Sequence, residues 1–335
     1  MKLISGSFLA AVVLLGALFS SAFAQNPVVM KLGTATVNDS THEWLKIFAK
    51  YVEQDSGGRI KGEIYPASQL GSSESMIEQV QLGVIQGEAG SPEFLTGLDS
   101  RYQVLSAAGL FKDVPHANRV LQDPEFNKAF LGLGADKRIL GIGLLIGAPS
   151  VFATRKPIHK LSDFNGLKIR VLGGRMQQAQ VRTLNMSAVP MSLGDVMPAL
   201  QQGALDGVLA GLPVLTALHY YDAAKYIVET DHGLLAAIAI ISLKWYTSLP
   251  ADLQAIIIKA GQRASADVYQ FSVDDISRAR QKWLANGGEI TKLDPADQDK
   301  MMKEMEAVSE REMSANPKNK AMFDLLRKTA KRTSN

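Results

Sequence analysis

Few side chains in this sequence have the types and spacing that an enzyme requires. The five histidines are dispersed, and His42-Glu43 begins like a zinc-protease motif but has Lys46 where the second histidine should stand. There is no cysteine, so thiol chemistry is excluded, and no Gly-x-Ser-x-Gly elbow occurs. The glycine pair at residues 141–143 lacks the third glycine of a dinucleotide-binding loop. We therefore predict a protein that is not an enzyme, with no metal site and no cofactor.

One arginine stands where it could bind an anion. Arg170 lies near the end of a predicted strand, after the glycine and lysine of a Gly-x-Lys-x-Arg segment at residues 166–170. A guanidinium presents parallel N–H donors that match the two oxygens of a carboxylate. Most arginines are solvated, however, so the residue type alone leaves a surface position open.

The first residues predict export. Lys2 is followed by an apolar run at residues 8–18 and by Ala22-Phe23-Ala24, which is a small-x-small cleavage site. We expect cleavage after Ala24 and a periplasmic protein; the alternative, an uncleaved anchor, is disfavoured because the run is short for a bilayer. No cysteine follows the cleavage site, so we expect no lipid anchor.

The composition also restricts the class of partner. The formal net charge is +3, and the positive charges are scattered rather than gathered into a basic stripe with interleaved aromatic residues. A nucleic-acid partner is therefore not expected. We also expect a soluble mature chain, since no second apolar run reaches transmembrane length without a charge or a turn.

The periodicity predicts an α/β fold. Strand-like segments at 28–33 and 60–65 alternate with helical patterns, and residues 139–146, 150–153 and 234–243 indicate buried strands. The last hundred residues are mainly helical. Because no linker of low complexity separates the segments, we expect two domains that share more than one crossover, with a ligand cleft between them.

Several short motifs in a fixed order resemble one transport family. They are YPASQLG at 65–71, LKIRV at 167–171, VPM at 189–191, ALQQGALDG at 199–207 and LPADLQ at 249–254. The series resembles the DctP-type substrate-binding proteins of tripartite ATP-independent periplasmic (TRAP) transporters and spans essentially the whole mature chain. The resemblance implies a small organic acid as ligand and the small and large permease subunits as partners. A binding protein for an ATP-driven transporter or a sensor kinase is the alternative, and an exported enzyme is a distant third.

The resemblance also implies an architecture. We expect a two-lobed periplasmic binding protein, in the α/β class, with mixed sheets, chain crossovers and a long helix that spans the hinge. After the signal peptide at 1–24, the first lobe comprises 25–147 and 236–275. The second lobe comprises 148–235 and 276–335, including the C-terminal helices. We expect the protein to be a monomer.

In the family, the arginine of the Gly-x-Lys-x-Arg segment binds the carboxylate of the ligand. In this sequence that arginine is Arg170. Other positions differ from the sialic-acid-binding members of the family: Ala210 replaces an asparagine, Ser150 a second arginine, Ser91 a glutamate, and Ala35 a polar residue. Because a buried polar group without a partner costs about 1–3 kcal/mol, such a pocket disfavours a sugar acid. We therefore predict a monocarboxylate with an apolar or aromatic body.

Further pocket candidates rest on residue type. Phe152 could stack on a flat ligand or lie in the core, and Ser91 and Ser150 could donate hydrogen bonds or be ordinary loop serines. Arg175 begins a predicted helix and could be a second anion anchor or a solvated side chain. Met191 is expected in the apolar wall of the cleft.

Overall fold

The computed structural model describes residues 27–334, and the predicted cleavage site after Ala24 lies outside these residues. The strands are β1 (Val28–Gly33), β2 (Ile60–Tyr65), β3 (Gly87–Gly90), β4 (Ile139–Thr154), β5 (Lys168–Val171), β6 (Ser187–Pro190), β7 (Gly207–Gly211), β8 (Tyr226–Ser242) and β9 (Glu289–Lys292). The α-helices are α1 (Ser40–Asp55), α2 (Ser73–Leu82), α3 (Val114–Gln122), α4 (Pro124–Leu131), α5 (Arg175–Thr183), α6 (Leu193–Gln201), α7 (Leu212–Ala217), α8 (Leu243–Ser248), α9 (Ala251–Ala285), α10 (Pro295–Ser314) and α11 (Pro317–Arg332). Five short 3₁₀ helices connect them: η1 (Pro92–Leu95), η2 (Ser100–Ser106), η3 (Gly132–Lys137), η4 (Leu161–Phe164) and η5 (Tyr220–Asp222).

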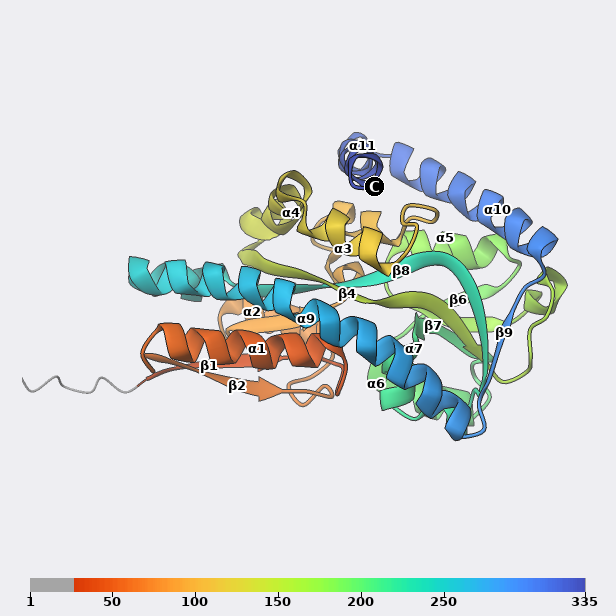
Figure 1. The fold of residues 1–335 in the computed structure, drawn as a ribbon, viewed down its shortest axis with the longest axis horizontal. Helices are drawn as coiled ribbons and strands as arrows, with labels where there is room; N and C mark the ends of the chain where they lie inside the picture. The colour runs from red at the N-terminus through yellow and green to blue at the C-terminus, as the bar shows by residue number, and fades with distance from the viewer. Residues whose placement is uncertain (1–26, 335) are drawn as a thin grey trace, which may run out of the picture.

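Two long strands, β4 and β8, join the two halves of one mixed sheet. The strand order is β2-β1-β3-β8-β4-β7-β5-β6, with β9 added beside β8. We call β2, β1 and β3 the first half and β7, β5 and β6 the second half. Pairs within each half are parallel, whereas β8 is antiparallel to β3 and β4, and β4 is antiparallel to β7. The expected mixed sheet with chain crossovers is thus present (Figure 1).

The centre of β4 is irregular where it passes from one half to the other. Its pairing with β8 shifts register between Ile146 and Ala148 and again between Pro149 and Val151. Proline donates no ladder hydrogen bond, and a bulge bends and twists its strand. The sequence pattern predicts two strands in this region, whereas the structure has one continuous strand with a bend, because pairing with β8 carries it through the irregular segment.

The long helix α9 runs across both halves of the molecule (Figure 1). It packs against α1 and β4 at one end of its course and against α7 further along. In the first half, the indole N–H of Trp44 donates to Ser265 Oγ at 3.0 Å. In the second half, Trp283 of the same helix packs edge-on against Tyr221. The expected long helix is therefore present and is held by both halves.

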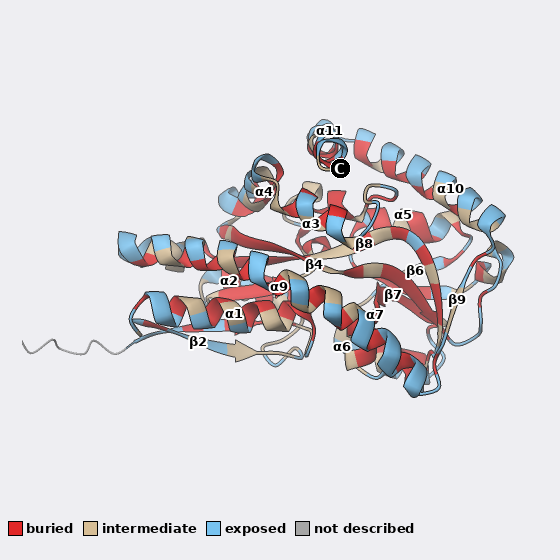
Figure 2. Cartoon of the chain, in the orientation of Figure 1, coloured by how far each residue is buried: buried red, intermediate tan, exposed pale blue. Residues whose placement is uncertain are grey.

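The core follows the sheet, whose strands are mostly buried while the helices expose their outer faces (Figure 2). Apolar clusters fill both halves, and the C-terminal helices divide between them. Helix α10 packs against α5 of the second half, whereas α11 packs against η2 and α3 on the side of the first half. Within the described residues, no helix is both long and apolar enough to cross a membrane.

Candidate ligand-binding site

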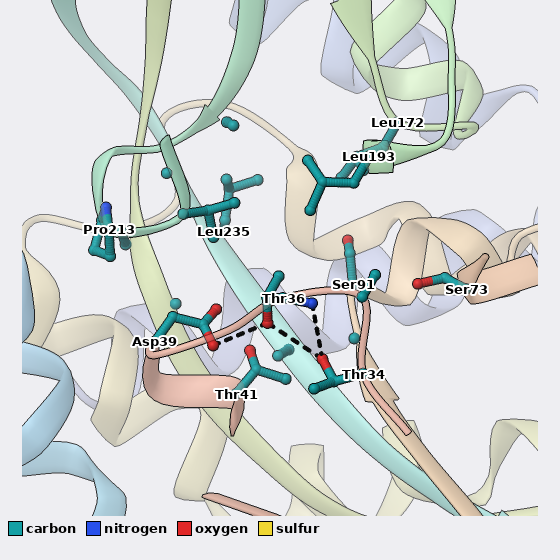
Figure 3. Close-up of a pocket in the computed structure, with 18 of the residues that line it drawn as sticks. Thr34, Thr36, Asp39, Thr41, Ser73, Ser91, Leu172, Leu193, Pro213 and Leu235 are labelled. Atoms are coloured by element: carbon teal, nitrogen blue, oxygen red, sulfur yellow. Dashed lines mark hydrogen bonds between the residues drawn. The ribbon is translucent and has the colours of Figure 1, made fainter. Parts of the chain in front are cut away.

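A cavity lies where the two halves meet at the bend of β4 and β8. Its walls come from the loop between β1 and α1, the ends of β3 and β5, the centres of β4 and β8, and the junction of β7 with α7 (Figure 3). The side chains and backbone that line it are Thr34, Ala35, Thr36, Asp39, Ser40, Thr41, Ser73, Gly90, Ser91, Phe94, Gly147, Ala148, Arg170, Leu172, Leu193, Leu209, Ala210, Gly211, Pro213, Val214, Leu235, Ala236 and Ala237.

Arg170 is the cationic residue of this cavity. It lies on β5 between β6 and β7, opposite Val189 on one side and Val208 on the other. Because side chains alternate along a strand, Arg170 is on the opposite face from its neighbour Ile169, which is buried in an apolar cluster. The strand therefore directs Ile169 into the core and Arg170 to the cavity.

The guanidinium of Arg170 is buried but only partly hydrogen-bonded. The residue is 2% exposed. Its Nε donates to the backbone carbonyl of Met191 at 2.8 Å, while Nη2 has no hydrogen-bond partner among the described residues. Burial lowers the pKa of Arg170 to about 10, so the group still carries its proton at neutral pH. A buried cation with free donors is a site for an anion, because an unpaired buried charge is costly.

The first half contributes a row of polar side chains at the carboxyl end of β1. Thr36 donates its hydroxyl proton to Asp39 Oδ1 at 2.9 Å, and its own backbone N–H donates to Thr34 Oγ1 at 3.3 Å (Figure 3). Asp39 also caps α1, because Oδ1 accepts from the backbone N–H of His42 at 3.0 Å. Burial raises the pKa of Asp39 above its ordinary value.

The remaining wall is apolar. Leu172 and Leu193 project from the second half, and Leu235 and Pro213 lie near the bend of the sheet (Figure 3). Such a wall favours an apolar ligand body through the hydrophobic effect. The cavity thus combines one cation, one polar row and an apolar wall.

Comparison with known proteins identifies the family. Residues 33–316 match the DctP family, described as bacterial extracellular solute-binding protein, family 7. The chain belongs to this family. It is thereby a solute-binding protein of the TRAP type rather than an enzyme, which confirms both predictions. The family acts outside the cytoplasm, in agreement with the expected periplasmic location.

Among relatives, the chain is 27% identical to the C4-dicarboxylate-binding periplasmic protein DctP of Rhodobacter capsulatus, over 77% of each chain. Solved structures share the fold. A TRAP periplasmic solute-binding protein of Desulfovibrio salexigens with bound orotic acid has a TM-score of 0.86 and 24% identity. One of Shewanella oneidensis with bound succinate has a TM-score of 0.84 and 24% identity. Each match covers 91% of this chain and 99% of the other. The α/β fold with its long helix is therefore confirmed.

Four of the residues singled out in the sequence line the cavity of this binding protein. Arg170 and Ala210 do so from the second half, and Ala35 and Ser91 do so from the first half. The hydroxyl oxygen of Ser91 also accepts from the backbone N–H of Glu93 at 3.3 Å and caps η1. Their contact with a ligand stays a prediction.

The other four residues do not line the cavity. Phe152 is 0% exposed and packs between Phe164 and His232 in the core of the second half. Ser150 is buried in β4, and Arg175 is an exposed residue in the first turn of α5. Met191 contributes its carbonyl oxygen to Arg170 rather than its side chain to the wall. For these positions the structure favours the structural alternative, because the bend of β4 turns Phe152 and Ser150 away from the cavity.

Sequence reasoning missed the polar row formed by Thr34, Thr36 and Asp39. The signal that could have found it is the position of these residues, directly after the first predicted strand and before a helix whose cap is Asp39. Ligands of α/β proteins are commonly held beyond the carboxyl ends of strands. As for metals, residues 27–334 contain no group of three or more histidine or acidic side chains positioned to hold an ion.

Proposed function

We propose that this protein binds a small organic acid through Arg170 and delivers it to the small and large membrane subunits of a TRAP permease. The observation that carries the proposal is the buried guanidinium of Arg170, whose Nη2 lacks a partner in a cavity between the two halves of the sheet. A carboxylate would accept from this free edge and neutralise the charge.

The mechanism requires the ligand to contact both lobes. We assign residues 25–147 and 236–275 to the first lobe and 148–235 and 276–335 to the second, with α11 of the last segment packed back against η2 and α3 of the first. A ligand held by Arg170 in the second lobe and by polar groups of Thr34 and Thr36 in the first stabilises the closed state relative to the open one. Differential affinity of this kind is the only way in which a ligand can shift such an equilibrium. The permease then recognises the closed, monomeric protein.

The cavity supports a monocarboxylate with an apolar or aromatic body as the ligand. A second carboxylate, as in the succinate bound by the Shewanella relative, would need a second cation, but Arg170 is the single cationic residue among those that line the cavity. Enclosing an uncompensated charge is costly. Orotic acid, bound by the Desulfovibrio relative, likewise has a single carboxylate, which is carried on a flat ring.

The test is ligand screening on the mature protein followed by calorimetry on variants. A thermal-shift screen of organic acids identifies binders, because ligand at about 100 times its Kd stabilises a protein by about 2.7 kcal/mol. Arg170→Ala should abolish binding of each acid that stabilises the wild type, and Arg170→Lys should weaken it nearly as much, because an ammonium group does not reproduce the fork of two donors.

Arg175→Ala is the matched control, since it removes an exposed arginine outside the cavity. It should bind as the wild type does. Near-native affinity in a folded Arg170→Ala variant would contradict the proposal, and a clear preference for succinate over monocarboxylates would contradict the ligand class.

A further inference from the structure

Asp39 is the second ionisable side chain that lines the cavity, and Arg170 does not neutralise it. The two residues belong to opposite halves of the sheet, and no ion pair joins them in the described part of the chain. The proposed function uses Arg170 and leaves the carboxyl group of Asp39 without a role toward the ligand.

The two oxygens of Asp39 differ in their surroundings. Oδ1 accepts from the backbone N–H of His42 and from the hydroxyl of Thr36. Oδ2 has no hydrogen bond to any described residue within normal geometry. Figure 3 shows Thr36 and Thr41 on the side of the bonded oxygen, whereas the other oxygen points away from these two side chains, on the side of the view where Leu235 is drawn. One oxygen therefore fixes the cap of α1, and the other is available to the cavity.

The hydroxyl of Thr41 approaches the carboxyl group and favours its ionised form, but it makes no hydrogen bond of normal geometry, and the rest of the labelled wall on that side is apolar. Leu235 and Pro213, the labelled side chains on that side in Figure 3, are apolar. The residue itself is 3% exposed, and burial raises the pKa of its carboxyl group. This oxygen borders the cavity, so a bound ligand can supply a donor to it, and a hydrogen bond to a carboxylate oxygen is stronger than one between neutral groups. A donor on a bound ligand would complete the hydrogen bonding of this oxygen.

We propose that Asp39 is a specificity-determining residue, which accepts a hydrogen bond from a hydroxyl or protonated amino group of the ligand. This inference rests on the proposed function, since Arg170 holds the carboxylate of the same molecule. The ligand class becomes a monocarboxylic acid whose apolar body carries one hydrogen-bond donor away from the carboxylate. Arg170 and Asp39 then fix the two ends of the ligand from opposite halves of the protein.

The variant Asp39→Asn separates this role from the role of Asp39 as a helix cap. Asparagine caps helices about as well as aspartate, so its oxygen continues to accept from His42 and Thr36. Its NH₂ group then replaces the available oxygen, which converts an acceptor in the cavity into a donor. The variant should fold normally and should lose the preference for donor-bearing ligands.

The probes are sets of acids that differ in one group. One set is phenylacetate, its 2-, 3- and 4-hydroxy derivatives and 4-methoxyphenylacetate; the other is pentanoate, 5-hydroxypentanoate and 5-aminopentanoate. Calorimetry with the wild type should show at least about tenfold tighter binding of a hydroxyl or amino member than of the unsubstituted acid of its set, as expected for a hydrogen bond to a charged acceptor. In Asp39→Asn this preference should fall at least about tenfold. Comparison of hydroxyl with amino members identifies which donor the site takes.

Asp113→Asn is the matched control. Asp113 caps α3 in the same way, by accepting from the backbone N–H of His116 at 2.7 Å, but it is exposed and lies outside the cavity. It should leave every affinity unchanged. The inference would be overturned if the wild type bound donor-bearing and unsubstituted acids equally well, or if Asp39→Asn kept the preference of the wild type. In either case, binding that is lost in Arg170→Ala would leave the proposed function intact. Absence of Arg170-dependent binding of any acid would overturn both.

Discussion

Glu93 makes the stability of this protein depend on pH in a direction that can be worked out. The residue is 1% exposed, and its carboxyl group lies against Gly174, the N-cap of α5, so closely that a Cβ added to Gly174 would meet Glu93 Oε2 at 1.2 Å. Neither carboxyl oxygen has a hydrogen-bond partner within normal geometry, although the hydroxyl of Ser106 favours the ionised form slightly. Burial raises the pKa of Glu93 from 4.5 to about 7.

The direction of this pH dependence follows from proton binding to Glu93 in the folded and unfolded states. Between pH 4.5 and about 7, the folded protein keeps the proton on Glu93 while the unfolded chain releases it. The free energy of unfolding therefore falls as the pH rises through this window. At about 1.4 kcal/mol for each pKa unit, the loss from this one residue amounts to about 3 kcal/mol by pH 8.

Glu93→Gln should remove this loss, because an amide stays neutral at every pH. The assay is equilibrium unfolding in urea from pH 4.5 to 8.5, followed by circular dichroism and tryptophan fluorescence, whose coincidence tests for a two-state transition. The difference in unfolding free energy between Glu93→Gln and the wild type should increase by about 3 kcal/mol from the lower to the higher pH.

Glu53→Gln is the control, since Glu53 is an exposed glutamate on α1 and should give a curve parallel to that of the wild type. Glu88 provides a second case: burial raises its pKa from 4.5 to about 8, so Glu88→Gln should show a larger gain, about 5 kcal/mol, over a window that extends about one pH unit higher. Parallel curves for the wild type and Glu93→Gln would refute the argument that burial holds this carboxyl group neutral.

Two further predictions concern the hinge-spanning helix and export. Gly261→Ala should destabilise the protein by about 1–3 kcal/mol in urea unfolding, because the added Cβ would lie 2.3 Å from the carbonyl oxygen of Ile142 and would force α9 away from β4. The control Gly132→Ala, whose added Cβ meets nothing within 4 Å, should have nearly the stability of the wild type. Equal stability of the two variants would contradict the close approach of α9 to β4. Mass spectrometry of protein recovered from the periplasm should show Gln25 at the amino terminus, and a mature chain that retains the apolar run would show that the cleavage prediction is wrong.

The family and the order of the elements follow from local sequence. Short-range patterns such as the helical spacing of Trp44 and Phe48, the alternation at 60–65 and the ordered motifs around Arg170 depend on neighbours within a few residues. A single sequence contains that information, which is why β1, β2, the long helix and the family are predicted from it, whereas the short strand β3 is not. The position of Arg170 at the end of its strand is of the same kind.

The composition of the cavity depends on contacts between residues far apart in the chain. Phe152 and Arg170 lie on neighbouring segments of similar pattern, yet Phe152 enters the core beside His232 and Arg170 enters the cavity. The difference arises because β4 bends where it passes between the halves, and that bend is set by pairing with β8, which lies more than seventy residues further along the chain in every pair. Local sequence does not encode on which side of such a bend a side chain emerges.

The same reason explains Asp39. The sequence by itself indicates that a helix begins here, since aspartate before an amphipathic pattern is a common N-cap. Only the tertiary structure brought the β1–α1 loop opposite β5 and the bend of β8, so that one carboxyl oxygen of the cap faces the same cavity as Arg170. Local sequence thus determined the family, several of the strands and the proposed anion anchor. The folded chain decided which polar groups share the cavity with that anchor, because burial and the loss of water depend on all the elements that close around it.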